Sequence, residues 1–409
     1  MLEELTEKEF QEFSKESPSK NFMETIEIGN LRKANEWTIN YLGLKENGKI
    51  VGATLLLSKK RHFNKYEFYA LRGPLLDYND KKVVSTFLSE LKKYVKKHNG
   101  YCLRLDPYLP LRRFDGKNNE LSLNYAPNIT LNVLNSLGFK KTEQEEQVSS
   151  MYVLNLKDKS ENDILKEMKA NTRNCIRKTI KNGIEVVELQ KEELQEFYDV
   201  MIETGKRKGF DVRNISYYEN MYDIFSKNGE IKYLVTRLNL DKYVELLENE
   251  IKENETKKQK LSASSCNDGK RKEFETTIES LKKRINIAKE QKKKANKSVI
   301  TLAGSMFVMT RPEIVYLSSG NYEKYMMYNS QYLIQWEMIK YAIANGYERY
   351  NFYGTPITSK KDKSYGIYEF KAGFNGFMEQ LIGEYVVATS TVYYRINLIH
   401  KIKKSERNL

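Results

Sequence analysis

Apolar and polar residues alternate with a period of two in the first part of the chain. This pattern predicts strands over 39–45, 50–58 and 66–71, with Asn47-Gly48 as the hairpin turn between the first two. From 82 to 98 the apolar positions instead follow a period of 3.6, which predicts an amphipathic helix. Another strand, 101–105, follows directly.

The same order of elements returns in the second part of the chain. Strands are expected over 298–309 and 314–318, an amphipathic helix over 328–344 and a further strand over 347–353. In both parts an Asn-Gly-Tyr sequence stands between helix and strand. The recurrence favours two copies of one α/β domain, although Asn-Gly is also a common helix stop.

A different pattern separates the two parts. Apolar positions step by four and three over 240–261 and again over 274–288, which predicts two heptad seams. The polar sequence 262–269 reads as a turn, so the two helices should form an antiparallel coiled-coil arm. We therefore predict one domain over 1–150, a second over 151–239 and 298–409, and the arm over 240–297.

Composition and charge narrow the function classes. The net charge of +14 favours anionic partners such as nucleic acid, nucleotide phosphates or acidic lipids. Cys102, Cys175 and Cys266 are far apart, so neither a metal-type pair nor a disulfide framework is expected, and a cytoplasmic protein fits. Three scattered histidines and short apolar runs argue against a zinc site and a membrane span.

Four basic residues recur every fourth position and would form a stripe on one face of a helix. They are Lys169, Arg173, Arg177 and Lys181. Such a stripe suits a nucleic-acid backbone, and a tRNA is the expected ligand, but a solvated helix face has the same pattern.

Three further places contain residues suited to chemistry. The segment 205–218 concentrates cations with tyrosines, among them Arg213 and Tyr217, a combination that can grip a phosphate. Lys371 lies between Phe370 and Phe374, where it would either stabilise an oxyanion or extend from a packed strand to solvent. Asp106 ends a predicted strand before a proline and is either a site carboxylate or a turn residue.

Seven segments, in order along nearly the whole chain, resemble the FemA/FemB/FemX family, which includes the MurM type. They are LRGPLLDY (71–78), LRLDPYLP (103–110), NTRNCIRKTIKNGIEV (171–186), ETGKRKGFDVRNISYY (203–218), the inserted arm, QYLIQWEMIKYAIANGYERYNFYG (331–354) and YEFKAGFNGFMEQLIGEY (368–385). The resemblance implies two GNAT-like acyltransferase domains. It also implies transfer of an amino acid from aminoacyl-tRNA to the stem-peptide amine of a peptidoglycan precursor, lipid II or UDP-MurNAc-pentapeptide.

The resemblance also implies roles for individual residues, without a metal or other cofactor. Lys371 would lie near the reacting carbonyl or the tRNA end, Glu384 would support it, and Asp106 would orient or deprotonate the amine. The substrate-binding positions would be Lys33 (or its neighbour Arg32), Arg213, Tyr217 and Tyr316. The amino-terminal region lacks the family's usual Gln and aromatic residue, which leaves the choice between Arg32 and Lys33 open.

Other functions and partners remain open from the sequence. An acetyl-CoA-dependent N-acetyltransferase fits the expected fold, but the pyrophosphate-binding loop of that class is absent. A noncatalytic RNA-binding protein would need only the basic helix and the arm. Val392, Ile396, Ile399 and Ile402 share a helical face beside basic residues, which favours either a peripheral site on an anionic membrane or packing on the second domain. Related family members are also candidate partners.

Overall fold

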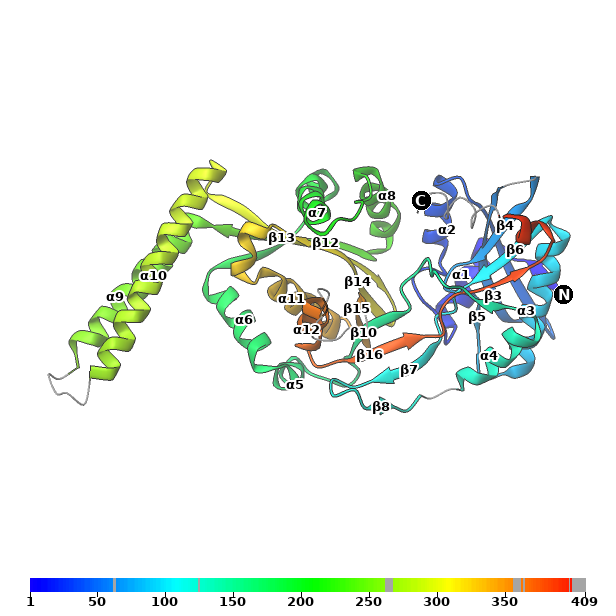
Figure 1. The fold of residues 1–409 in the computed structure, drawn as a ribbon, viewed down its shortest axis with the longest axis horizontal. Coiled ribbons are helices and arrows are strands. Elements are labelled where there is room, and N and C mark those ends of the chain that lie inside the picture. Colours follow the sequence, from blue (N-terminus) through cyan, green and yellow to red (C-terminus); the bar gives the residue numbers. More distant parts are fainter. Residues whose placement is uncertain are drawn as a thin grey trace.

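The computed structural model describes residues 1–61, 64–123, 126–261, 268–355, 362, 365–396 and 398. In this part of the chain two β-sheets lie side by side with helices packed on them, and a pair of long helices projects from the far end of the second sheet (Figure 1). The predicted α/β class with two sheet-containing halves and an inserted arm is confirmed.

The first sheet has the strand order β1-β2-β3-β4-β6-β17-β9, with β5 paired to β3. Its strands are β1 (Leu2–Glu4), β2 (Thr38–Glu46), β3 (Lys49–Lys60), β4 (Tyr66–Ala70), β5 (Leu75–Leu76), β6 (Gly100–Leu105), β9 (Lys140–Lys141) and β17 (Tyr385–Ala388). The helices of this half are α1 (Glu7–Glu16), α2 (Ile26–Ala34), α3 (Lys81–Lys97) and α4 (Pro127–Ser136).

The second sheet has the order β11-β12-β13-β14-β15-β10-β16-β7-β8. Its strands are β7 (Pro110–Phe114), β8 (Glu120–Leu121), β10 (Ser150–Asn155), β11 (Ile184–Glu188), β12 (Ile231–Asn239), β13 (Val299–Thr310), β14 (Glu313–Asn321), β15 (Arg349–Gly354) and β16 (Phe377–Leu381). The α-helices are α5 (Glu161–Glu167), α6 (Ala170–Lys181), α7 (Leu194–Lys208), α8 (Ile215–Phe225), α11 (Ser330–Ala344) and α12 (Tyr365–Ala372), with 3-10 turns η2 (Lys191–Glu193), η3 (Ser226–Asn228) and η5 (Glu323–Tyr328).

Both halves contain the same supersecondary unit. In the first half α3 connects β4 to β6, and in the second α11 connects β14 to β15; each of these strand pairs is parallel. Each helix ends at the predicted Asn-Gly, where Asn99 (φ 60°) and Gly346 (φ 69°) take the left-handed conformation that reverses the chain. The helices and strands predicted around these turns are therefore confirmed.

The strands do not divide between the sheets at the predicted domain limits. β7 and β8, from within 1–150, pair in the second sheet, because β7 joins β16. β17, from within 298–409, joins β6 in the first sheet. The chain therefore crosses between the sheets four times: after β6, at Asp106; between β8 and β9; between β9 and β10; and before β17, at Glu384. Alternation of apolar and polar residues identifies strands, but it does not say which sheet an individual strand joins.

One hydrophobic core spans both halves. Its buried members include Phe10 and Leu55 from the first half, and Phe197, Met221 and Met306 from the second. The helices α2 and α8 face each other across this boundary, where the Asn228 side-chain amide donates to Glu27 Oε1 over 2.9 Å. Because a shared core is expensive to separate, it holds the two halves in one relative position.

The predicted coiled-coil arm is confirmed as α9 (Leu240–Gln259) and α10 (Asp268–Ala295). Its two helices run antiparallel, with ion pairs from Lys292 to Asp241 (2.6 Å) and from Lys258 to Glu275 (2.5 Å). The base of the arm belongs to a core that also includes Tyr325 and Tyr328 of η5. Most of the turn predicted over 262–269 lies outside the described residues.

The last described helical segment, 392–396, packs on the first sheet. Ile396 is only 3% exposed and lies against Tyr101 and Cys102, with Val392 beside them. Val392 and Ile396 are therefore packed against the protein and do not face a bilayer. The surface that covers them belongs to the first half, not to the second domain as the packing alternative expected. Ile399 and Ile402 lie outside the described residues. Where the chain is described, none of its helices is both long and apolar enough to cross a bilayer.

The packing of the arm predicts different results for two deletions. Replacing 256–277 by a short Gly/Ser linker should leave the unfolding midpoint unchanged, because the base core is retained. Replacing 241–297 should lower the midpoint by several degrees, since it uncovers Ile184, Tyr325, Tyr328 and Leu333. Thermal unfolding followed by circular dichroism measures both. Equal midpoints for the two deletions would show that the base contributes nothing to the core.

Candidate functional site

A pocket of about 550 Å³ opens in the second half, between β14, the end of β15, α11 and α12. Two predicted site residues, Tyr316 and Lys371, line it, and we call it the Lys371 pocket. Its other lining residues are Arg207, Lys208, Leu317, Ser318, Ser319, Asn321, Met326, Asn329, Ser330, Gln331, Tyr332, Phe352, Tyr353, Gly354, Gly366, Ile367 and Phe370. The Tyr316 ring stacks on Phe307, and its hydroxyl lies 3.4 Å from Gln331 Oε1. The pocket thus combines cations with aromatic rings.

Lys371 lies on the helix α12, not on a strand, and is only 5% exposed. Its Nζ donates to the carbonyl oxygens of Gly354 (2.6 Å) and Tyr353 (3.3 Å) and to Thr355 Oγ1 (3.1 Å). An ammonium group has three protons, so these acceptors occupy all of them. In this arrangement Lys371 supports residues 353–355 from beneath and has no spare donor for an oxyanion.

Burial lowers the pKa of Lys371 to about 7, and the positive charge of Lys208 acts in the same direction. Both the ammonium and the amine forms are therefore present near neutral pH. The alternative in which Lys371 extends from a packed strand to solvent is wrong, because the side chain is buried on a helix and makes three hydrogen bonds.

Arg207 and Lys208 are pocket residues that sequence reasoning did not single out from their basic segment. They belong to the last turn of α7, and Gly209 (φ 71°) then turns the chain away. Arg207 Nη2 donates to the carbonyl oxygen of Asn321 over 3.4 Å. The end of α7 at Lys208 thus separates these two residues from Arg213, which lies beyond the turn.

Arg213 and Tyr217 lie at the boundary between the halves, opposite α2. The Arg213 guanidinium lies 5.7 Å from the centre of the Tyr217 ring. Burial raises the pKa of Tyr217, while the charges of Arg213 and Arg32 oppose that rise. Arg32 therefore faces this cluster from α2, whereas Lys33 is exposed to solvent. Of the two candidates, the structure places Arg32 with Arg213.

Asp106 is buried where the chain leaves the first sheet, with 2% of its surface exposed. Its Oδ1 accepts the backbone N–H of Arg72 (2.7 Å), and its Oδ2 lies 3.4 Å from Arg72 Nη1 without a hydrogen bond. Burial raises the pKa of Asp106 to about 6, against the opposing charge of Arg72, and the charge of Glu384 adds to the rise. Asp106 is not among the residues that line the Lys371 pocket.

Glu384 is held by the first sheet. Arg104 donates from Nε to Glu384 Oε1 (2.9 Å) and from Nη2 to Oε2 (3.0 Å), and the Glu146 N–H donates to the same Oε2 (3.0 Å). The Glu384 carboxylate is buried, and both of its oxygens accept hydrogen bonds. It therefore acts on the candidate site through its charge, which lies near Asp106. The structure does not bring Glu384 to Lys371.

Tyr353 was not predicted as a site residue, and it lies between Asp106 and Lys371. It lines the Lys371 pocket and also a small cavity of about 10 Å³ that it shares with Arg72 and Tyr108. Its backbone is left-handed, with φ at 57°, which costs a residue other than glycine about 1–2 kcal/mol. Strained backbone is found disproportionately at functional sites, and an uninterrupted strand pattern over 347–353 does not reveal it.

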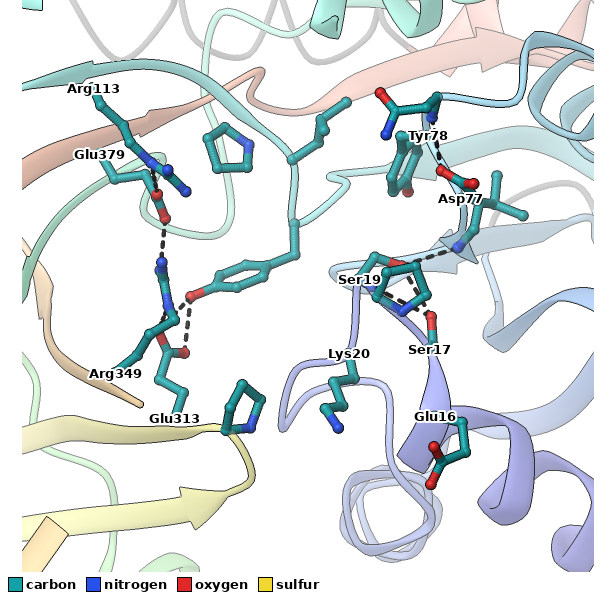
Figure 2. Close-up of a pocket in the computed structure, with 17 residues that line it drawn as sticks. Glu16, Ser17, Ser19, Lys20, Asp77, Tyr78, Arg113, Glu313, Arg349 and Glu379 are labelled. Carbon is teal, nitrogen blue, oxygen red and sulfur yellow. Dashed lines mark hydrogen bonds and ion pairs between the residues drawn. The ribbon is translucent and has the colours of Figure 1, made fainter. Parts of the chain in front are cut away.

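A buried ion network supports this region from the second sheet. Glu379 accepts from Arg113 Nε (2.6 Å) and Arg349 Nη2 (2.9 Å), and Arg349 Nε donates to Glu313 Oε1 (3.2 Å). Figure 2 shows these four residues as one wall of a pocket of about 380 Å³ between the halves, with Lys20 and Ser19 on the other side. None of the predicted site residues lines this second pocket.

The predicted basic stripe is only partly free. Arg173 Nη1 donates to the carbonyl oxygens of Leu165 (3.3 Å) and Lys166 (3.2 Å) at the end of α5. Lys181 forms an ion pair with Glu250 of the arm at 2.6 Å. Lys169, the N-cap residue of α6, and Arg177 are exposed, and Arg177 Nη1 donates to Asn174 Oδ1 over 3.5 Å. Arg173 and Lys181 therefore contact other helices, which repetition along the sequence could not show.

No group of three histidine, cysteine, aspartate or glutamate residues suited to a metal ion occurs among the described residues.

Comparisons with known proteins cover nearly the whole chain. A model described as the FemAB family matches residues 5–401. Aminoacyltransferase FemA of Staphylococcus epidermidis is 31% identical, over 98% of this chain and 99% of the relative. Aminoacyltransferase FemB of the same species (strain ATCC 12228 / FDA PCI 1200) is 29% identical, over 98% of each chain. A solved structure titled "Crystal structure of FemX" has a TM-score of 0.75 at 22% identity and covers 97% of this chain and 99% of that one, which confirms the fold.

The pKa of Lys371 predicts how stability changes with pH. The unfolded chain holds this proton up to about pH 10.5 and the folded chain only to about 7, so the unfolded state binds more protons between these values. The free energy of unfolding of the wild type, minus that of Lys371→Met, should therefore rise from about pH 7 to 9, by at most about 1.4 kcal/mol per pH unit. Urea titrations across this range measure the difference. A constant difference would mean that buried Lys371 keeps an ordinary pKa.

Proposed function

The chain belongs to the FemAB family, and from this premise we propose that it transfers an amino acid from aminoacyl-tRNA to the stem-peptide amine of a peptidoglycan precursor. The observation that carries the proposal is the match over 98% of the chain to relatives named aminoacyltransferase. The protein is accordingly an acyltransferase that joins an activated ester to an amine.

The acceptor site that we propose lies at the boundary of the halves. Peptidoglycan precursors, whether lipid II or UDP-MurNAc-pentapeptide, carry a diphosphate, which needs fixed cations. The charges of Arg213 and Arg32 both act on Tyr217 at this boundary, and the Arg213 guanidinium lies 5.7 Å from the centre of its ring. Guanidinium groups bind phosphate oxygens in pairs, so two of them suit a diphosphate.

Asp106 is our candidate for the group that binds the acceptor amine. Its Oδ2 is buried and accepts no hydrogen bond within the described residues. An amine that donates to this oxygen would gain a charge-assisted bond, and a carboxylate with a pKa of about 6 is ionised at neutral pH. Asp106 then orients the amine and takes its proton as the new bond forms.

The Lys371 pocket is our candidate site for the aminoacylated end of the tRNA. Arg207 and Lys208 provide positive charge for phosphates, and Tyr332 and Phe370 present aromatic rings on which bases stack. Exposed Lys169 and Arg177 on α6 would contact the tRNA backbone further away.

The chemical step requires alignment more than activation. The acceptor nitrogen attacks the ester carbonyl, a tetrahedral oxyanion forms, and the carbon–oxygen bond to the tRNA then breaks. The proton of the amine passes to a base, and the tRNA hydroxyl leaves with a proton. Because the ester is already activated, the protein's main contribution is to hold amine and carbonyl within about 3–3.5 Å of each other.

Product analysis tests the proposal. The protein is incubated with lipid II or UDP-MurNAc-pentapeptide and with tRNA that is charged with one amino acid at a time. The mass of the acceptor is then measured by mass spectrometry. A mass increase of one amino-acid residue that requires the charged tRNA is the expected result. An increase of one acetyl group with acetyl-CoA, or binding of tRNA without any product, would overturn the proposal in favour of an acetyltransferase or an RNA-binding protein.

The pKa of Asp106 predicts a pH profile. Because the ionised form is needed, kcat/KM for the acceptor should fall as the pH drops below about 6. Asp106→Asn should lower kcat roughly 10²-fold or more and remove this acidic limb. Initial rates between about pH 5 and 8 check both effects. An unchanged limb in the variant would assign it to another group.

Arg213→Ala should weaken acceptor binding about 10- to 150-fold, because a charge-assisted hydrogen bond contributes about 1.5–3 kcal/mol. Arg32→Ala should cause a larger loss than Lys33→Ala, since Arg32 faces the cluster and Lys33 faces solvent. Isothermal titration with UDP-MurNAc-pentapeptide provides the dissociation constants. A larger loss from Lys33→Ala would reassign the phosphate contact to Lys33.

A further inference from the structure

Tyr353 lies on the path between the two proposed substrate sites. On one side it lines the Lys371 pocket, and on the other it shares a cavity of only about 10 Å³ with Arg72. The charges of Arg72, Asp106 and Arg32 all act on its phenol, so the ring lies within reach of the acceptor groups. Among the residues that the structure describes, no other one lines both cavities. Substrates bound at the two proposed sites would meet beside this ring.

The backbone of Tyr353 is held from both directions. Its N–H donates to Asn351 Oδ1 over 2.7 Å, and its carbonyl oxygen accepts from Lys371 Nζ (3.3 Å) and Thr355 Oγ1 (2.9 Å). These three bonds hold the residue at its positive φ of 57°. A left-handed residue directs its side chain away from the line that a regular strand would give it.

Asn351 is itself fixed by the second sheet. Its Nδ2 donates to the Tyr108 hydroxyl (3.1 Å), and that hydroxyl donates to Glu313 Oε2 (2.9 Å). Glu313 belongs to the ion network of Arg349, Glu379 and Arg113 in Figure 2. The Tyr108 N–H also donates to the carbonyl oxygen of Arg72 (3.3 Å), the partner of Asp106. One network thus positions both Tyr353 and the loop that contains Asp106.

We propose that Tyr353 contacts both substrates, aligning the acceptor amine with the donor ester and keeping water from that ester, and that Asn351 and Lys371 are positioning residues that act through it. This inference rests on the proposed transfer reaction. It also explains Lys371 without an oxyanion contact, because its three protons are used to hold 353–355.

The ring decides between two reactions of the ester. With the ring in place the amine attacks the carbonyl, and the tRNA hydroxyl leaves. Without it, water attacks the same carbonyl, the bond to the tRNA oxygen breaks, and the free amino acid and a tRNA with a terminal hydroxyl are released. The ratio of transfer to hydrolysis therefore reports the role of the ring separately from the quantity of folded protein.

The test compares Tyr353→Asn with Tyr353→Phe. Asparagine tolerates the left-handed backbone but has no ring, whereas phenylalanine keeps the ring and loses only the hydroxyl. Tyr353→Gly, which also accepts positive φ, replaces the asparagine variant if that one fails to fold. Each variant is assayed with charged tRNA and UDP-MurNAc-pentapeptide for both products, and Tyr394→Asn, at an exposed tyrosine of the C-terminal helical segment, is the matched control.

We expect Tyr353→Asn to lower the transfer-to-hydrolysis ratio roughly 10²-fold, as loss of alignment by about 1 Å would do. Tyr353→Phe, which keeps the ring, should lower the ratio far less than Tyr353→Asn, and Tyr394→Asn should keep the wild-type ratio. A wild-type ratio in folded Tyr353→Asn or Tyr353→Gly would overturn the inference. Absence of transfer by the wild type would instead overturn the proposed function, so the two failures are distinguishable.

The positioning roles have their own test. Lys371→Met should lower the same ratio, and the double variant Lys371→Met/Tyr353→Asn should be no worse than Tyr353→Asn alone, because the lysine acts through the tyrosine. Asn351→Ala should behave in the same way. Independent, multiplying effects of Lys371→Met and Tyr353→Asn on the ratio would show that Lys371 contacts the substrate by itself and would overturn its positioning role.

Discussion

The shared hydrophobic core between the two halves is the constraint on which the rest of the structure depends. Residues from α1, α2 and β3 share one core with residues from α7, α8 and β13, so each half buries part of its apolar surface against the other. In addition, β7 from the first part of the chain joins the second sheet, and β17 from the last part joins the first sheet. These two strands tie the halves together further. A reaction between two large substrates needs such a fixed geometry, because each half contributes groups that must stay in register.

The groups with unusual chemistry collect where this boundary meets the sheets. Asp106 and Glu384 lie where the chain crosses between the sheets, and Tyr353 ends the strand that follows α11. Each is held by several hydrogen bonds or ion pairs from surrounding backbone and side chains. Rigid support of this kind lets a protein keep a buried carboxyl, a buried amine and a left-handed tyrosine close together.

The local pattern of the sequence was a good guide to the elements. Period 3.6 predicted α3 and α11, heptads predicted α9 and α10, and Asn-Gly predicted the turns after both repeated helices. The pattern failed where non-local pairing decides, as for β17, and it gave no reason to place Lys371 on a helix with its side chain buried. The resemblance named residues of the site, but the choice of Arg32 over Lys33 depends on which face of α2 meets α8. The left-handed backbone of Tyr353 depends on Asn351 and Lys371, which only the folded chain brings together.

A structure with a stable conjugate would test the account most directly. In such a compound the stem-peptide amine of UDP-MurNAc-pentapeptide is joined through a non-hydrolysable link to an adenosine-terminated oligonucleotide that mimics the tRNA end. The account predicts the diphosphate at Arg32 and Arg213, the terminal nucleotide in the Lys371 pocket and the linking atom against the Tyr353 ring, within about 4 Å. A conjugate whose linking atom lies away from Tyr353, or whose two ends both occupy the pocket between Lys20 and Arg349, would contradict it.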